Sequence, residues 1–189
     1  MIKIPTNISD LYVLEPRIFN DDRGYFFESY NKNTLSKLDL QYNFVQDNES
    51  FSERGVFRGF HFQLGNFAQA KLVRACFGSI VDIAIDLRPD SETFGESFAV
   101  ELSQENNKQL IIPRGFAHGF LVTSEYAKVL YKADNFYNPS SECGFNLSSY
   151  LSKLHLPNIG EIKINDKDKN YQGFNEIVQQ IKSKNILVV

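Results

Sequence analysis

Alternation of apolar and polar residues dominates the middle of the chain. From residue 81 to residue 87, Val, Ile, Ile and Leu alternate with Asp, Ala and Asp, which is the period of a half-buried β-strand. The same period-two pattern runs over residues 127–133. Glycine, proline and short polar runs separate the apolar segments, as turns do in β-rich proteins. The pattern therefore predicts many short strands rather than long helices.

Further strands are predicted where an apolar run lies between two such turns. The expected strands are 11–19, 25–30, 56–63, 70–77, 79–87, 98–102, 109–122 and 127–133, with Gly78-Ser79 as a hairpin turn. Roughly ten short strands joined by turns favour an all-β sandwich or barrel of the jelly-roll kind, and the pattern does not separate the two.

Two helices are expected beside the strands. A short one over residues 33–40 would place Leu35 and Leu38 on one face, with Asn33 or Thr34 as its cap. A terminal one over residues 175–184 has its apolar residues on one face. Residues 44–50 are rich in amides and acids, and residues 162–170 are expected to form a charged loop. With no linker or repeat, residues 1–189 are predicted to be a single jelly-roll domain with a C-terminal helical tail.

Composition limits the classes of binding partner and the cellular compartment that we expect for this protein. The chain has 189 residues, a net charge of −3 and no long basic run, so neither nucleic acid nor an anionic membrane is an expected partner. Its first residues do not resemble a signal peptide, and no apolar run is long enough to cross a bilayer. Cys76 and Cys143 are far apart and form no CxxC motif, which favours reduced thiols in a cytoplasmic protein.

The densest candidate chemistry lies at Arg58-Gly-Phe-His-Phe-Gln63, followed closely by Lys71 and Arg74. Histidine exchanges a proton near neutral pH, and a nearby cation stabilises negative charge on a substrate oxygen. The alternative is a core histidine with surface arginines. In a regular strand Arg58 and His61 would point to opposite faces, so a shared site requires a bulge, for which Gly59 is the natural place.

His61 as a general base would pair with Tyr131 as a general acid on the opposite side of a substrate. A carboxylate should orient the histidine, and Asp82, Asp166 and Asp168 are all candidates. The alternative for Tyr131 is a core tyrosine with a local hydrogen bond.

Metal binding and anion binding were the other two possibilities. A non-haem iron site could use His61, His118 and Asp82, but no HxH or HxxxH pair is present, so no metal site is expected. Two or three separate cations could converge on a phosphate, the alternative being an ordinary solvated surface. The candidate cations are Arg23, Arg58, Lys71, Arg74, Arg114 and Lys167.

Several segments, in order, resemble the dTDP-4-dehydrorhamnose 3,5-epimerase family. They are DDRGYFFESYN, FVQDNES, RGVFRGFHFQ, AQAKLVRACFGSIVDIAIDLR, TFGESFAVELSQENNKQLIIPRGFAHGFLV, VLYKADNFYNP and INDKD, between Leu11 and Asp168. The resemblance implies a cupin-type jelly roll that acts, without metal or cofactor, on a dTDP-4-keto-6-deoxyhexose. It also implies a homodimer whose strands exchange across the interface.

The resemblance further implies roles for individual residues. His61 matches the proton acceptor, Tyr131 the proton donor, Asp168 the carboxylate paired with the histidine, and Lys71 the lysine near the ketone oxygen. Tyr137 matches the aromatic residue that stacks on thymine. The remaining matches to substrate-contacting positions are Arg23, Glu28, Gln46, Asp47, Asn48, Arg58, His118, Glu142 and Lys167.

The sequence departs from the family pattern at several points. Ile111 replaces a tryptophan, Arg114 a glutamate and Glu49 a histidine, and residues 146–157 replace a tryptophan-containing segment. These changes bear on nucleotide or sugar preference rather than on proton transfer. The expected activity is inversion of carbons 3 and 5 of dTDP-4-dehydro-6-deoxyglucose. The rivals are a 3-epimerase, an epimerase of another nucleotide-sugar, a metal-dependent cupin oxygenase and a sugar-binding jelly roll without turnover.

Overall fold

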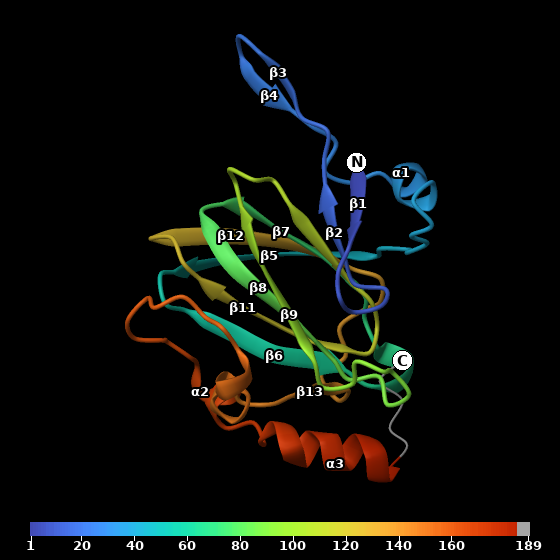
Figure 1. Cartoon of the computed structure of the whole chain (residues 1–189), viewed down its shortest axis with the longest axis vertical. Helices are drawn as coiled ribbons and strands as arrows, with labels where there is room; N and C mark the ends of the chain where they lie inside the picture. Colours follow the sequence, from blue (N-terminus) through green and yellow to red (C-terminus); the bar gives the residue numbers. More distant parts are fainter. Residues whose placement is uncertain (185–189) are drawn as a thin grey trace.

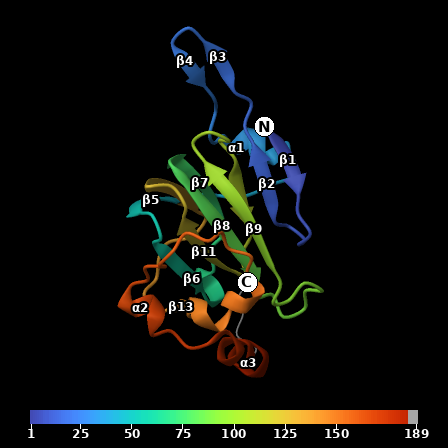
Figure 2. The same cartoon turned by 60° about the vertical axis from the view of Figure 1, so that its left-hand side comes forward.

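Two antiparallel β-sheets form the body of the molecule, and the computed structural model describes residues 1–184. The sheets face each other, as Figures 1 and 2 show from two directions. The first has the strand order β1-β2-β10-β7-β12-β5, the second has the order β13-β6-β11-β8-β9, and a separate hairpin pairs β3 with β4.

The bounds of the elements are as follows. The first sheet consists of β1 (Ile2–Pro5), β2 (Tyr12–Glu15), β10 (Gln109–Ile112), β7 (Lys71–Phe77), β12 (Tyr126–Ala133) and β5 (Gln46–Glu53). The second consists of β13 (Glu142–Gly144), β6 (Phe57–Gln63), β11 (Phe116–Val122), β8 (Ser79–Asp86) and β9 (Ser97–Ser103). The hairpin is β3 (Phe19–Asp21) and β4 (Gly24–Phe26). The helices are α1 (Lys32–Ser36), α2 (Asp166–Lys169) and α3 (Phe174–Lys184), with short 3₁₀ turns at Gly65–Phe67, Leu147–Ser149 and Leu151–Lys153.

The central strands of the second sheet are buried on both faces. The inner face of this sheet packs against the first sheet through residues such as Val73 and Val129 on one side and Ala84 and Phe120 on the other. Its outer face is covered by α3 and the turns before it, and Ile177 is among the α3 residues in this second core. Burial on both faces explains why polar residues do not alternate with apolar ones along β11, where His118 is the one polar side chain.

Two packed antiparallel sheets with short flanking helices form a jelly roll of the cupin type, so the predicted fold class is confirmed. The strands expected around residues 70–87 and 127–133 are also present. The hairpin expected at Gly78-Ser79 was wrong: Gly78 lies between β7 and β8, but these strands belong to different sheets and do not pair. The φ of Gly78 is +66°, and a Cβ there would lie 2.0 Å from the Tyr126 carbonyl oxygen. None of the helices within residues 1–184 has the length and apolar composition needed to span a lipid bilayer.

Several predicted boundaries were wrong. The strand expected over 11–19 is divided into β2 and β3, and of the strand expected over 25–30 only Tyr25 and Phe26 are extended, as part of β4. The stretch 109–122 is divided into β10 and β11, since Pro113 cannot donate a ladder hydrogen bond. The first helix begins at Lys32 because Asn31, rather than Asn33 or Thr34, accepts hydrogen bonds from the first-turn amides.

Short polar elements were missed. The expected charged loop contains α2, and the polar segment from residue 46 is β5. The alternation of β5 was not recognised because its inward residues, among them Asn48 and Ser52, are also polar. β1 and β13 were missed as well, since strands of three or four residues carry too little periodicity to detect.

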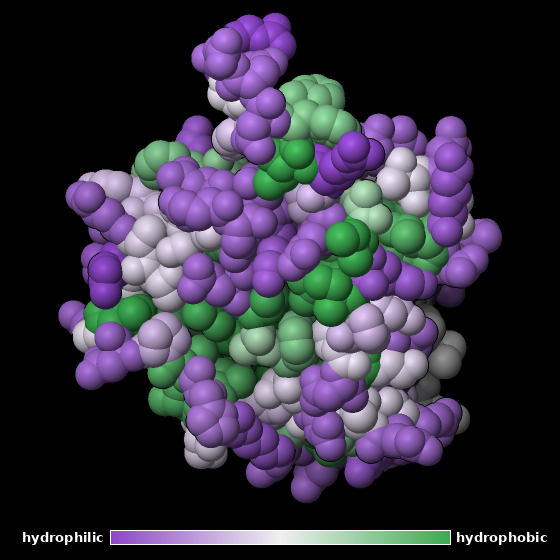
Figure 3. Space-filling model, turned by 45° about the horizontal axis from the view of Figure 1, so that its top comes forward, coloured by the Kyte–Doolittle hydropathy of each residue, from purple (hydrophilic) through white to green (hydrophobic). Residues whose placement is uncertain are grey.

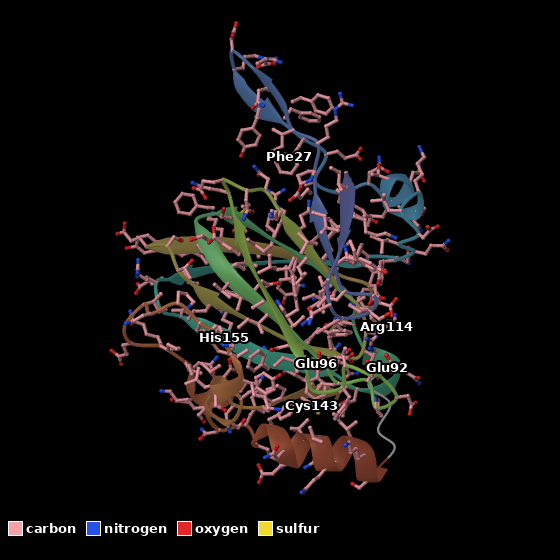
Figure 4. The ribbon with its side chains drawn as sticks, in the orientation of Figure 1. Phe27, Glu92, Glu96, Arg114, Cys143 and His155 are labelled. Carbon is pink, nitrogen blue, oxygen red and sulfur yellow. The ribbon has the colours of Figure 1, made fainter. Side chains whose placement is uncertain are left out.

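The β3–β4 hairpin, with Ile18 before it and Phe27 after it, projects from the body and is called the arm below. Figure 1 shows it extending beyond the N-terminus, and Figure 3 shows its hydrophilic tip standing clear of the surface. Its aromatic residues are unusually exposed: Phe19 by 50%, Tyr25 by 59% and Phe26 by 70%. Phe27 lies where the arm joins the body (Figure 4), and Arg74 stacks on its ring at 5.1 Å.

Candidate functional site

A polar cavity of about 300 Å³ opens between the two sheets. Strands of both sheets contribute to it, together with the start of α2. The lining residues are Asn48, Glu49, Ser50, Arg58, His61, Lys71, His118, Phe120, Tyr131, Asn165 and Asp168.

A β-bulge at Gly59 brings Arg58 and His61 to this one cavity. In the pairing of β6 with β11, His61 lies opposite His118 and Arg58 opposite Phe120, so three steps along β6 match two along β11. Gly59 has φ +131°, and a Cβ there would lie 2.6 Å from the Gly119 Cα. Only glycine fits this close approach in that conformation, and the bulge predicted as a condition for a shared site is confirmed.

His61 is paired with Asp168. The Nε2 of His61 lies 2.8 Å from Oδ1 of Asp168, and the other carboxylate oxygen accepts the backbone N–H of Gly59 at 3.2 Å. Burial raises the pKa of Asp168, but the hydrogen bond and charge of His61 and the Gly59 amide outweigh it, so the pKa lies below its ordinary value. The carboxylate is therefore ionised and accepts the proton of Nε2.

His118 is paired with Asp82 in the same way. Its Nε2 lies 2.7 Å from Oδ1 of Asp82, and both residues are buried. Burial lowers the pKa of His118, and the negative charge of Asp82, which raises it, offsets this only in part. Among the three carboxylates considered for His61, the geometry thus gives it Asp168, while Asp166 is exposed on α2.

The arrangement does not assemble the iron site considered from the sequence. His61, His118 and Asp82 would have to converge on one point, but each histidine has its own carboxylate. Within residues 1–184, no three His, Cys, Asp or Glu side chains are grouped as metal ligands.

Lys71 and Tyr131 enter the cavity from the first sheet, opposite the wall that carries His61. The Nζ of Lys71 lies 5.9 Å from the centre of the Tyr131 ring. Burial lowers the pKa of Lys71 to about 8, although the charges of Asp82 and Glu142 oppose the change. Burial raises the pKa of Tyr131, so its hydroxyl is protonated at neutral pH.

Glu142 holds two predicted substrate residues together at the cavity's edge. One oxygen, Oε2, accepts both the Tyr137 hydroxyl and the Nζ of Lys167 at 2.6 Å. Burial raises the pKa of Glu142, but these two hydrogen bonds outweigh it and leave the pKa lowered. The buried amide of Gln63 accepts the N–H of Asn138 at 2.6 Å, which fixes the loop that carries Tyr137.

The three residues Gln46, Asp47 and Asn48 are divided between two faces of β5. Asn48 lines the cavity, and Gln46 accepts the backbone N–H of Tyr137 at 3.1 Å. Asp47 pairs with Lys132 at 2.9 Å and lines a neighbouring hollow of about 220 Å³, which shares Asn48 and Tyr131 with the cavity.

Arg23 and Glu28 are not brought to the cavity of their own chain. Arg23 pairs with Asp21 at 2.5 Å near the tip of the arm, and 90% of its side chain is exposed. Glu28, after the arm, accepts hydrogen bonds from Asn31 and Thr34 at 2.8 Å each.

The six separate cations do not form one cluster. Arg58 and Lys71 line the cavity, Lys167 pairs with Glu142 at its edge, and Arg74 stacks on Phe27. Figure 4 labels Arg114 away from the arm, and it pairs with Asp134 at 3.0 Å. Of the substitutions that depart from the family pattern, Glu49 is the one that borders the cavity, whereas Ile111 is buried.

Sequence reasoning missed three lining residues: Ser50, Phe120 and Asn165. Asn165 could have been found, since an asparagine before Asp-Lys-Asp-Lys is a typical helix cap. Its side chain accepts the N–H of Asp168 at 2.7 Å and so fixes the start of α2.

Comparisons with known proteins agree on one family. The family model described as dTDP-4-dehydrorhamnose 3,5-epimerase matches residues 5–176. The Salmonella typhimurium dTDP-4-dehydrorhamnose 3,5-epimerase is 55% identical over 143 residues, which cover 75% of this chain and 78% of the relative. The Escherichia coli K12 enzyme of the same name is 44% identical over 177 residues, 93% of this chain and 96% of the relative.

A solved structure extends the likeness to three dimensions. The dTDP-6-deoxy-D-glucose-3,5-epimerase of Legionella pneumophila, in complex with dTDP-4-keto-L-rhamnose, superposes with a TM-score of 0.88. It is 39% identical in sequence, and the match covers 93% of this chain and 94% of that one.

Proposed function

We propose a mechanism from the premise that this chain belongs to the dTDP-4-dehydrorhamnose 3,5-epimerase family and is therefore an isomerase. The substrate is dTDP-4-dehydro-6-deoxyglucose, and inversion of carbons 3 and 5 gives dTDP-4-dehydro-L-rhamnose. The observation that carries the mechanism is that His61 and Tyr131 stand on opposite sheets, one on each side of the same cavity.

The 4-keto group makes the hydrogens on carbons 3 and 5 acidic, because removal of either leaves an enolate. His61 takes the proton with its free ring nitrogen, since the other is bonded to Asp168. Lys71 stabilises the negative oxygen of the enolate. Tyr131 then gives its hydroxyl proton to the opposite face of the carbon, which inverts the centre, and the two side chains return to their starting states by exchange with solvent.

The nucleotide binds at the edge of the cavity in this proposal. Tyr137, which is half-exposed, stacks on thymine, while Glu142 and Lys167 keep it in position. Arg58, His118, Gln46 and Asn48 contact the sugar and the phosphates. The mechanism uses protein side chains alone, with no metal and no cofactor.

Two further expectations belong to this proposal. The protein works as a homodimer, in which the arm of one copy packs on the other and brings Arg23 and Glu28 to its cavity. The exposed aromatic residues of the arm support this, because contiguous apolar surface of this kind is typical of an interface. The reaction takes place in the cytoplasm, in keeping with two cysteines that are both free in the structure.

Hydrogen exchange in deuterated water tests the chemistry directly. The purified protein, with a chelator present, is incubated with dTDP-4-keto-6-deoxyglucose and followed by NMR. Deuterium is expected at carbons 3 and 5, together with the rhamno product. Exchange at carbon 3 alone would assign the protein to the 3-epimerases. Binding of the nucleotide-sugar without exchange would mean that the protein binds it but does not convert it.

Variants of the two central residues test the assignments. His61→Ala is expected to lower the exchange rate roughly a hundred- to ten-thousand-fold, the usual contribution of a general base. Tyr131→Phe should spare exchange more than product formation, because the base still works when the donor is missing. Full activity of His61→Ala, or unchanged product formation by Tyr131→Phe, would remove that residue from the mechanism.

A further inference from the structure

The imidazole of His61 is held at one point by its carboxylate partner. Asp168 is itself held in position, because the N–H of Gly59 donates to its side chain at 3.2 Å and its own N–H donates to the side chain of Asn165 at 2.7 Å. The ring of His61 is not enclosed, since 31% of its side chain is exposed. A single hydrogen bond leaves a planar ring able to tilt about that bond, so a second contact is needed to fix the free nitrogen.

Tyr171 supplies that contact. Its ring meets the imidazole of His61 in a T-shaped arrangement, with the centres 5.9 Å apart and the planes at 65°. Aromatic pairs favour this edge-to-face geometry. Tyr171 follows α2 directly, so the segment that supplies the carboxylate also supplies the ring.

The neighbouring backbone leaves space for the ring of Tyr171 and holds the residue by a hydrogen bond. Gly144 lies opposite His61 in the pairing of β13 with β6, and a Cβ on it would be 2.8 Å from Cε2 of Tyr171. The absence of a side chain at Gly144 therefore makes room for the ring beside the histidine. The carbonyl of Tyr171 accepts a hydrogen bond from the side chain of Asn146 at 2.7 Å, which ties the residue to the end of β13.

We propose that Tyr171 is a positioning residue for the epimerase reaction: its ring fixes the plane of the His61 imidazole while Asp168 fixes one of its nitrogens. This inference rests on the proposed role of His61 as the base. It assigns the effect to the aromatic ring, not to the hydroxyl, because the contact with His61 is made by the ring.

The first test compares Tyr171→Ala with Tyr171→Phe in the deuterium-exchange assay. The alanine variant is expected to lower kcat roughly two- to tenfold, the range of an aromatic pair, with KM unchanged. The phenylalanine variant keeps the ring and is expected to keep the wild-type kcat. Lys169→Ala, in the same segment and exposed, is the matched control and should behave as the wild type.

The second test does not depend on turnover. The Nε2 proton of His61, bonded to Asp168, is identified by NMR as the imidazole resonance that disappears in His61→Gln. In Tyr171→Ala this resonance is expected to broaden through faster exchange with water, and in Tyr171→Phe it should stay sharp. If the wild type shows no substrate exchange, the proposed function fails, but this resonance still tests the contact.

Two results would overturn the inference. One is a Tyr171→Ala variant with wild-type kcat and an unchanged His61 resonance. The other is an equal loss of kcat in the alanine and phenylalanine variants, which would assign the effect to the hydroxyl.

Discussion

At the scale of single residues, Lys71 has the most consequential environment. Burial lowers its pKa to about 8, so the side chain changes charge close to the pH of the cell. Asp82 and Glu142 keep the pKa from falling further. The proposed enolate stabilisation needs the charged form, so the pKa sets an upper limit on the working pH.

The value of kcat/KM is therefore expected to fall as the pH rises through about 8, where Lys71 of the free enzyme loses its proton. Lys71→Arg keeps a charge throughout this range, because arginine does not deprotonate in proteins. The alkaline decline should move to higher pH in Lys71→Arg, whatever its absolute rate. A decline at the same pH in both proteins would mean that another group causes it.

The roles of individual residues were only partly predictable. Histidine, tyrosine and lysine could be selected by their chemistry, but the partner of His61 could not. Asp82 and Asp168 are equivalent in type, and the choice depends on which elements pack beside each histidine: α2 brings Asp168 to His61, and β8 brings Asp82 to His118. Tyr171 carried no signal, because an aromatic residue in a polar tail has no periodicity to mark it.

At the scale of elements, the bulge in β6 is the decisive irregularity. Strict alternation would send Arg58 and His61 to opposite faces, and the extra residue at Gly59 places both at the cavity. The sequence indicated where such a bulge could occur, because glycine allows it, but not that it would occur. The strand β5 shows the converse, since a strand whose inner face lines a polar cavity lacks the apolar alternation that reveals most strands.

Gly59→Ala is expected to destabilise the protein by about 2–6 kcal/mol, combining backbone strain at φ +131° with overpacking against β11. Gly160→Ala is the matched control, because its φ is also positive, at +84°, but a Cβ would meet nothing within 4 Å. Strain alone predicts a loss of about 1–2 kcal/mol there. Chemical denaturation of the two variants measures the difference, and equal losses would show that contact with β11 contributes nothing.

At the scale of the whole molecule, the arm exposes aromatic residues that packing within a single chain does not explain. Its aromatic residues have the composition of a buried strand, which is why residues 25–30 were predicted to be one. The jelly roll itself was predictable, since its central strands alternate over long stretches. The arm could not be predicted in the same way. An aromatic composition indicates that a segment will be covered by other protein surface, but it does not indicate which chain provides that surface.

Mixed dimers can decide whether the arm acts on the partner. Arg23→Ala and His61→Asn homodimers are each expected to lose activity. The first lacks a substrate contact, and the second lacks the general base. In a heterodimer of the two, one cavity combines an intact His61 with the intact Arg23 of the other chain. Activity should return in the purified heterodimer, with one working site of two.

A heterodimer no more active than its parents would mean that Arg23 serves its own chain or no site at all. Lys169→Ala, exposed on α2, provides the control partner. Paired with His61→Asn, it should give the same single working site.

A cavity completed by a second chain makes catalysis subject to mass action. The separated chain retains His61, Lys71 and Tyr131 but holds Arg23 far from them, at the tip of the arm. Specific activity then follows the fraction of chains that are paired, falling on dilution below the dissociation constant of the dimer and recovering on concentration. In the proposed homodimer, the arm would thereby couple the turnover of the sugar nucleotide to the abundance of the protein itself.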